Sequence, residues 1–137
     1  MQHVICYVST ATEQLNPAEI QQLMEQWCNR NGREDIKGIL LYSDGHFFQV
    51  LEGEKQQVLK LFFKIKEDPR HRGLIQVMGK DVEKGSLDHY IVDNLKANRY
   101  EKPELIKDYL ESVKGMESHV QQQIKTILES FIDTRVL

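Results

Sequence analysis

The chain has 137 residues, enough for one domain with a single hydrophobic core. Hydrophobic residues make up 40% of it and charged residues 28%, as in ordinary soluble proteins. The formal net charge is -3, so no basic excess attracts nucleic acid or an anionic membrane. The chain opens without a signal-peptide pattern, and no apolar run approaches the roughly 20 residues that cross a bilayer. The sequence therefore predicts a cytoplasmic protein.

The residues that most often carry catalysis or metal binding are few and scattered. Cys6 and Cys28 form no CxxC motif, so we expect two small buried thiols and no disulfide. No two histidines lie at ligand spacing, which argues against a metal site (His3, His46, His71, His89 and His119). The GxSxG, Walker-type GxxxxGKS or GxxxxGKT, and HExxH motifs are absent, and we expect no enzymatic activity.

The first two predicted elements are a strand and a helix. Residues His3–Ser9 alternate with the period of two that is typical of a strand. Both alternating sets are largely apolar, which indicates a strand covered on both faces. Asn16 can cap a helix that begins at Pro17, and Asn31–Gly32 can end it. The apolar stripe of this helix has the spacing of one helix face (Ile20, Leu23, Met24 and Trp27).

A hairpin and a second helix follow. Residues Ile36–Tyr42 and His46–Leu51 predict two strands, and the Asp-Gly pair in Ser43–Gly45 favours a tight turn between them. Because the turn is short, we expect these two strands to be antiparallel. Gly53–Asp68 predicts a helix that Pro69 ends. Its apolar residues share one face (Val58, Leu61, Phe62 and Ile65).

The remaining elements complete the order of a known architecture. Leu74–Gly79 predicts a fourth strand, Asp81–Leu87 a polar loop and His89–Val92 a short fifth strand. The order βαββαβ predicts an α+β, ferredoxin-like sandwich, in which both helices cover one face of an antiparallel sheet.

The last third of the chain lies outside that order. Pro103–Lys114 and Met116–Ile132 predict two amphipathic helices, separated by Gly115. Their apolar stripes need a partner, which is either the bare face of the sheet or another protein. The side chains expected on that bare face are apolar (Cys6, Val8, Phe48 and Val50). We therefore expect a main domain at 1–96 and a helical extension at 97–137.

Tyr7 and Gln49 are unusual inside predicted strands. A buried glutamine amide needs partners for two donor hydrogens and an acceptor oxygen, and a buried tyrosine hydroxyl needs one as well. Leaving one of these unpaired costs about 1–3 kcal/mol. If their strands are neighbours, the two side chains either satisfy each other in an ordinary core or line a site for a polar, planar ligand.

These segments together resemble the BLUF family, which senses blue light with flavin adenine dinucleotide (FAD). The resemblance covers His3–Asn94. It is most specific in Gly38–Gly53, which has a glycine, three hydrophobic residues and then Phe-x-Gln-x-Leu-Glu-Gly. Ile5–Ser9 and Asp68–Arg72 are also similar to the family's segments.

The resemblance implies that a flavin lies between the two helices of the main domain. Tyr7 would be the electron and proton donor, and Gln49 the amide that rearranges its hydrogen bonds after illumination. The other expected contacts are Leu23 and Ile65 on the faces of the ring, Asn31 at its polar edge, and Lys64, Asp68 and His71 toward the ribityl and phosphate end. The flavin would be FAD, with FMN or riboflavin as alternatives.

Several positions depart from the family's pattern. Trp27 stands where a small residue usually lines the pocket, and Arg30 where Asn or His is common; both are expected to face the cofactor. His89 and Ile91 stand where the family often has Trp and Met on the route to the output. These departures leave two hypotheses open.

The first hypothesis is a blue-light photoreceptor that signals by protein contacts to a downstream protein partner and forms homo-oligomers. The second is an interaction module with the same fold that has lost flavin binding. A small ferredoxin-like enzyme such as an acylphosphatase is disfavoured, because the glycine-rich, arginine-bearing phosphate loop of that family is missing.

Overall fold

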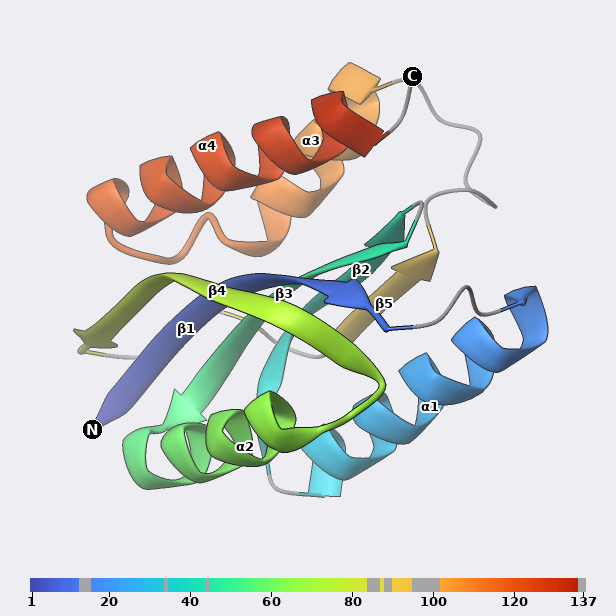
Figure 1. Ribbon diagram of the computed structural model, residues 1–137. Helices are drawn as coiled ribbons and strands as arrows, with labels where there is room; N and C mark the ends of the chain where they lie inside the picture. The colour runs from blue at the N-terminus through green and yellow to red at the C-terminus, as the bar shows by residue number, and fades with distance from the viewer. Residues whose placement is uncertain are drawn as a thin grey trace.

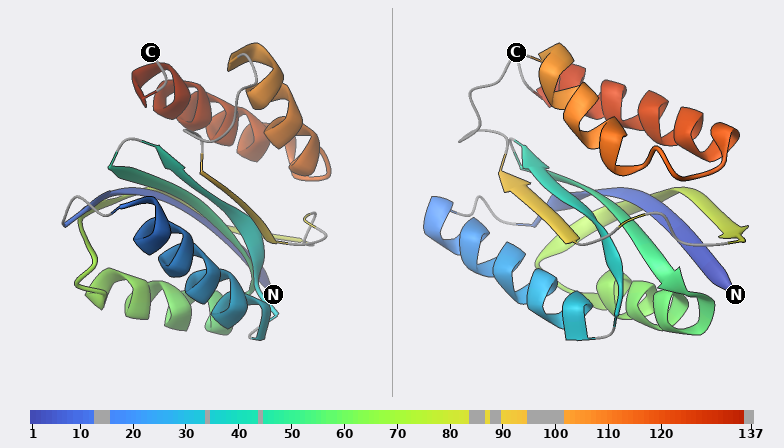
Figure 2. Two further views of the ribbon diagram at one scale, coloured as in Figure 1. Left: turned by 90° about the vertical axis from the view of Figure 1, so that its right-hand side faces the viewer. Right: turned by 180° about the vertical axis from the view of Figure 1, so that it is seen from behind.

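The computed structural model describes residues 1–12, 16–33, 35–43, 45–83, 87, 90–94 and 102–135. The elements follow in the order β1 (Gln2–Ala11), α1 (Pro17–Arg33), β2 (Lys37–Ser43), β3 (His46–Glu54), α2 (Lys55–Glu67), β4 (His71–Val82), β5 (Tyr90–Asn94), α3 (Lys102–Ser112) and α4 (Ser118–Arg135). The sheet is the middle layer, with α1 and α2 on one face and α3 and α4 on the other (Figure 1). Figure 2 shows the same three layers from two further sides.

The five strands of the described sheet lie in the order β4-β1-β3-β2-β5. β1 pairs antiparallel with β3 and β4, and β2 pairs antiparallel with β3. The ferredoxin-like α+β prediction is therefore confirmed. The predicted fifth strand is present as β5, which runs parallel to β2. Its predicted first residue, His89, lies outside the described residues.

Local signals placed the start of α1 well. Asn16 and Glu19 form the expected reciprocal cap, because Asn16 Oδ1 accepts from the backbone N–H of Glu19 (2.8 Å) and Glu19 Oε1 accepts from that of Asn16 (3.2 Å). The predicted end was wrong, since the helix runs through Gly32 to Arg33. In the hairpin, Gly45 has the positive φ of 86° that its turn requires.

Two other predicted boundaries were wrong. Gly53 was expected to begin the second helix, but it continues β3, where it pairs with His3. The cap of α2 is Glu54, whose carboxylate accepts from the backbone N–H of Gln57 (3.1 Å). β4 extends beyond 74–79 at both ends and takes Asp81 out of the predicted loop, because β1 pairs with it along its length.

Apolar residues of α3 and α4 pack on the face of the sheet that α1 and α2 leave bare, which is one of the two alternatives left open by the sequence. Cys6, Phe48 and Val50 are fully buried in one cluster with the apolar stripe of α4, and Val8 packs against that cluster. The rings of Phe48 and Phe131 lie 5.6 Å apart, centroid to centroid. Both faces of the central strands are therefore covered by helices. None of the described helices is long and apolar enough to span a membrane.

Candidate functional site

One row of side chains crosses the sheet on the face covered by α1 and α2. Tyr7 on β1 pairs with Gln49 on β3, and Gln49 pairs with Leu40 on β2. Directly paired residues of neighbouring strands point to the same face, so these three side chains lie side by side. All three are fully buried. Gln49 Nε2 donates a hydrogen bond to the hydroxyl of Tyr7.

The apolar core on this face is divided into two clusters. Tyr7 belongs to the cluster under α2, which contains Ile65, whereas Leu40 belongs to the cluster under α1, which contains Leu23 and Trp27. Gln49 stands between them in the row. We call the polar groups along this division the polar seam: the Tyr7 hydroxyl and the side chains of Ser9, Gln49, Asp68 and His71.

His71 links the seam to the end of α2. Its ring nitrogens contact the carbonyl oxygen of Ile65 (2.5 Å) and the hydroxyl of Ser9 (2.8 Å). A carbonyl oxygen only accepts, so Nε2 donates to Ile65. In a neutral imidazole, Nδ1 then accepts from Ser9. This arrangement fixes the orientation of a ring that is almost completely buried.

Trp27 fills the end of the seam between α1 and the end of α2. Its side chain is 1% exposed, and its Nε1 donates to Asp68 Oδ2 (3.3 Å). The indole ring lies 5.2 Å from the ring of Phe47 and 5.5 Å from that of His71, between centroids. The Arg70 guanidinium carbon lies over the indole, 5.9 Å from its centroid. A planar ligand entering here would displace the indole or stack on it.

Asp68 is held as an anion at this end of the seam. Burial by itself raises the pKa of its carboxyl, but hydrogen bonds and the charge of Arg70, with a hydrogen bond from Trp27, lower that pKa to about 2. Arg70 contacts both carboxylate oxygens, with Nη2 2.7 Å from Oδ2 and Nε 3.0 Å from Oδ1. Arg70 Nη1 also donates to Gln26 on α1 (2.6 Å), which closes the gap between the helices.

Most of the site residues predicted from the sequence lie together along the seam. These are Tyr7, Leu23, Trp27, Gln49, Ile65, Asp68 and His71. Lys64 is exposed on α2 and makes none of the contacts just described. Arg30 and Asn31 lie in the last turns of α1, and their side chains are outside the described part of the structure.

The two residues predicted for signal output lie elsewhere. Ile91 on β5 pairs with Ile39 of β2 and packs on the opposite face of the sheet, against the cluster beneath α3 and α4. His89 lies outside the described residues. Ile91 is thus on the side of the sheet that faces the helical extension.

Sequence reasoning missed Ser9, which belongs to the seam, and Arg70, which binds the Asp68 carboxylate of the seam. Ser9 shares its face of β1 with Tyr7 by the period of two, which is a signal that could have found it. Arg70 comes two residues after Asp68 at a helix end, where a turn can bring the two side chains together. The contacts of Arg70 with Gln26 and Trp27 join segments far apart in sequence, so no local signal announces them.

Comparison with known proteins identifies the family. A family model described as sensors of blue-light using FAD matches residues 2–90. Over 73 residues the chain is 37% identical to the photoactivated adenylate cyclase subunit beta of Euglena longa. This alignment covers 53% of this chain and 8% of that protein. Over 60 residues the chain is 37% identical to the blue light- and temperature-regulated antirepressor BluF of Escherichia coli. That alignment covers 44% of this chain and 15% of the antirepressor.

The likeness in structure extends over nearly the whole chain. Klebsiella pneumoniae BlrP1, solved with FMN and cyclic diGMP, superimposes with a TM-score of 0.81 at 26% identity. The superposition covers 97% of this chain and 36% of that one. This chain therefore spans well under half the length of each of these relatives. The match of the family model to residues 2–90, from the start of β1 to the first residue of β5, shows that this chain belongs to the BLUF family, the sensors of blue light that use FAD.

Proposed function

We propose that this chain senses blue light through a flavin bound between α1 and α2. The observation that carries the proposal is the buried Tyr7–Gln49 pair, which lies in a polar seam between two separate apolar clusters. In an ordinary ferredoxin-like core the two apolar clusters would join into one. Without a ligand, an apolar side chain in the place of Gln49 would stabilise the fold at least as well as the buried amide does.

The residues along the seam have the polarity that contacts to a flavin ring would need. The ring is flat, with apolar faces and an edge of hydrogen-bonding atoms. Leu23 from α1 and Ile65 from α2 belong to the clusters on either side and would contact the faces. Gln49 and Tyr7 would reach the polar edge. Asp68 and His71 stand at the end of α2, and we assign them, with Lys64, Arg30 and Asn31, to the remainder of the cofactor.

When bound, the flavin supplies absorption of blue light and, once excited, an electron acceptor. Tyr7 is the donor in this proposal, because its phenol is oxidisable and its hydroxyl is hydrogen-bonded directly to the Gln49 amide. Gln49 Nε2 donates to Tyr7 in the structure. Turning the amide over would present Oε1 instead, so that the Tyr7 hydroxyl would donate to Gln49. A change of this kind needs no movement of the backbone.

The proposed output passes through the sheet to the helical extension and then to a downstream protein partner. Gln49 lies between Phe48 and Val50 on β3, and both neighbours point to the opposite face, into the cluster that contains α4. Ile91 packs against the same cluster, and we assign it and His89 to this route. Homo-oligomers formed through the extension are part of the proposal.

One observation favours a second candidate, an interaction module without flavin. The Trp27 indole contacts Asp68, Phe47 and His71, and it is almost completely buried at one end of the seam. In that case the polar seam would be filled permanently by the protein's own side chains.

The absorption spectrum of the purified protein, in the dark and after blue light, separates the two candidates. The photoreceptor predicts a flavin spectrum that shifts slightly to longer wavelength and relaxes in darkness. Chromatography of the flavin released by denaturation then shows whether FAD, FMN or riboflavin is bound. A colourless protein that takes up none of the three, and whose Trp27→Ser variant takes up none either, would overturn the proposal.

A further inference from the structure

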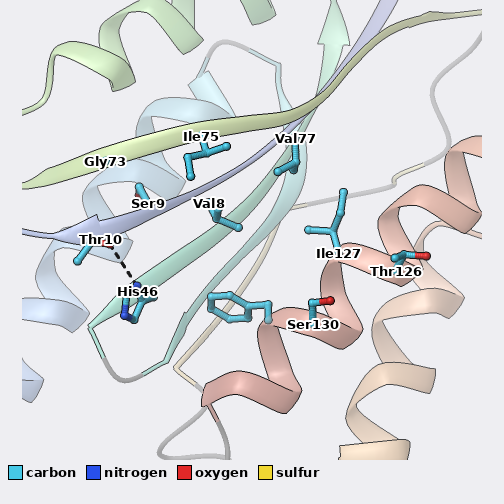
Figure 3. A pocket seen from close by; sticks show the side chains of 11 residues that line it. Val8, Ser9, Thr10, His46, Gly73, Ile75, Val77, Thr126, Ile127 and Ser130 are labelled. Atoms are coloured by element: carbon cyan, nitrogen blue, oxygen red, sulfur yellow. Dashed lines mark hydrogen bonds between the residues drawn. The ribbon is translucent and has the colours of Figure 1, made fainter.

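The opposite face of the molecule carries a groove at the edge of the sheet. We call it the β4 groove: the cavity of about 460 Å³ between β4 and α4 (Figure 3). Gly73, Ile75 and Val77 form its wall on β4, and Ile127 and Phe131 form its wall on α4. Ile75 is 60% exposed and Val77 37% exposed, although both are large and apolar. Apolar side chains exposed side by side often mark an interaction surface.

A second cavity continues the β4 groove along the same strand. It has a volume of about 770 Å³ and shares Val77, Thr126 and Ile127 with the first. It extends to Lys80 near the end of β4 and to His119 at the start of α4. The two cavities therefore form one trough that follows β4 over most of its length.

β4 is also an edge of the sheet. It is the first strand in the sheet order, and β1 is its hydrogen-bonded neighbour. Along the other side of β4, no strand of the described chain pairs with its backbone N–H and C=O groups. Such an edge can accept a further strand. The pairing of β4 with β1 on its inner side shifts register at two places. A strand added here would lie beside the exposed Ile75 and Val77.

The charged side chains around the groove indicate which charge an added strand should carry. Among the residues that the structure describes, the two cavities are lined by Lys80, His46 and His119 and by no carboxylate, although Glu117 lies 3.4 Å from His119. Arg72 is exposed one residue before the groove wall begins. If a second copy of β4 paired with this edge in register, Arg72 and Lys80 would lie opposite Arg72 or Lys80 of that copy. This holds for the parallel and for the antiparallel orientation. Like charges directly opposite one another in a sheet are destabilising.

We propose that an extended acidic segment of a partner protein adds to the outer edge of β4 and places its alternate apolar side chains in the β4 groove. Main-chain hydrogen bonds to β4 would supply affinity, and the groove and the cations would supply selectivity. Ser9, a member of the polar seam, also lines the groove, but no other lining residue belongs to the seam. A strand paired with the edge of β4 would therefore not need a bound flavin.

Fluorescence anisotropy with labelled peptides tests the proposal on the whole chain in the dark. The probe is a capped peptide of about nine residues, a typical strand length, that alternates valine and glutamate. The matched peptide replaces every glutamate with lysine. We expect saturable binding of the acidic peptide, at least about tenfold tighter than that of the basic one and weaker at high salt. Absent or charge-independent binding would overturn the proposal.

Two further comparisons test the geometry. The acidic peptide with N-methyl groups on alternate residues keeps its side chains but cannot pair with an edge, and it is expected not to bind. Ile75→Asp should weaken binding at least about tenfold by removing an apolar contact and adding repulsion. Phe63→Asp is the matched control, because Phe63 on α2 is also 60% exposed, and it should leave affinity unchanged.

The remaining outcomes decide against the proposal. If the methylated peptide bound as tightly as the unmethylated acidic peptide, edge pairing would be excluded. If Phe63→Asp weakened binding as much as Ile75→Asp, the β4 groove would be excluded as the binding site. Thermal unfolding of both variants shows whether each is folded. Sedimentation of the unliganded chain tests the other occupant: a dimer that Ile75→Asp dissociates would mean that a second copy fills the groove, which would overturn the proposal as well.

Discussion

At the scale of single residues, Gln49 combines complete burial with an amide at the centre of the row between β1 and β2. In the proposed mechanism this amide reverses its hydrogen bond with Tyr7. Leucine has nearly the same size but neither a donor nor an acceptor, so Gln49→Leu isolates the contribution of the amide.

We expect Gln49→Leu to bind flavin, keep its fold and lose the shift to longer wavelength after blue light. Tyr7→Phe, which removes only the hydroxyl, should also block the reversible response. The measurement is the difference spectrum between light and dark. Gln56→Leu is the matched control, because Gln56 is an exposed glutamine in the first turn of α2 and is not part of the polar seam. A normal shift in the Gln49 variant would contradict the assigned role.

Asp68 makes a prediction about pH. Its pKa in the folded protein is lowered to about 2, so the folded state binds its proton less readily than the unfolded chain does. A lowered pKa stabilises the fold at pH values above the pKa of the carboxyl in the unfolded chain, about 3.9. That stabilisation is lost as the pH falls through the folded pKa of about 2.

We therefore expect Asp68→Asn to lower the free energy of unfolding by about 1 kcal/mol at pH 7, after allowing for the partly exposed Arg70 partner. The difference from the wild type should shrink between about pH 4 and pH 2. Denaturant unfolding of both proteins across this range is the measurement. A difference independent of pH would show that the Arg70 contact does not perturb the carboxyl.

At the scale of elements, α4 is held by its apolar stripe. Leu128 is 1% exposed and packs in the same cluster as Phe48 and Val50. Replacing a buried leucine with alanine removes apolar contacts and leaves a cavity, which costs about 2–4 kcal/mol.

We expect Leu128→Ala to lower the free energy of unfolding by that amount, measured with denaturant. Gln122→Ala is the control, because Gln122 is exposed on the same helix, and it should change the free energy by less than about 0.5 kcal/mol. Equal, small effects of both substitutions would mean that α4 is not docked on the sheet in solution.

At the scale of the whole molecule, we propose the division at 1–96 and 97–137, with the second part serving as a cover for the sheet. Cys6 reports on that cover because it lies beneath it. The thiol is fully buried, and burial raises its pKa, which keeps it in the unreactive protonated form. Cys28 on α1 is partly exposed.

In a Cys28→Ser background, we expect Cys6 to react slowly with a thiol reagent in the native protein and rapidly in denaturant. Adding Leu128→Ala should raise the native rate, because a weaker α4 opens the cover more often. The rate of colour release from the reagent is the measurement. Fast native reaction without the second substitution would contradict a stable cover.

Whether a feature could be predicted from the sequence depends on how far apart in the chain the interacting residues lie. The cap of α1 and the alternation in β1 are local, and both could be recognised from neighbouring residues. The end of α1 and the start of α2 were misjudged, because Gly32 and Gly53 suggest a break that the surrounding structure overrides. The limits of β4 were misjudged because polar residues at an exposed edge have the composition of a loop.

The sequence by itself determined the order of elements, the family segments and the unusual polar character of Tyr7 and Gln49 within strands, since each depends on periodicity or on a motif within one segment. That Tyr7 and Gln49 lie side by side was decided by the pairing of β1 with β3. Only the tertiary structure decided where Trp27 packs, how Arg70 joins α1 to Asp68, and that β4 and α4 leave a groove. These features depend on contacts between segments far apart in the chain, and such contacts exist only once the strands have paired and the helices have docked.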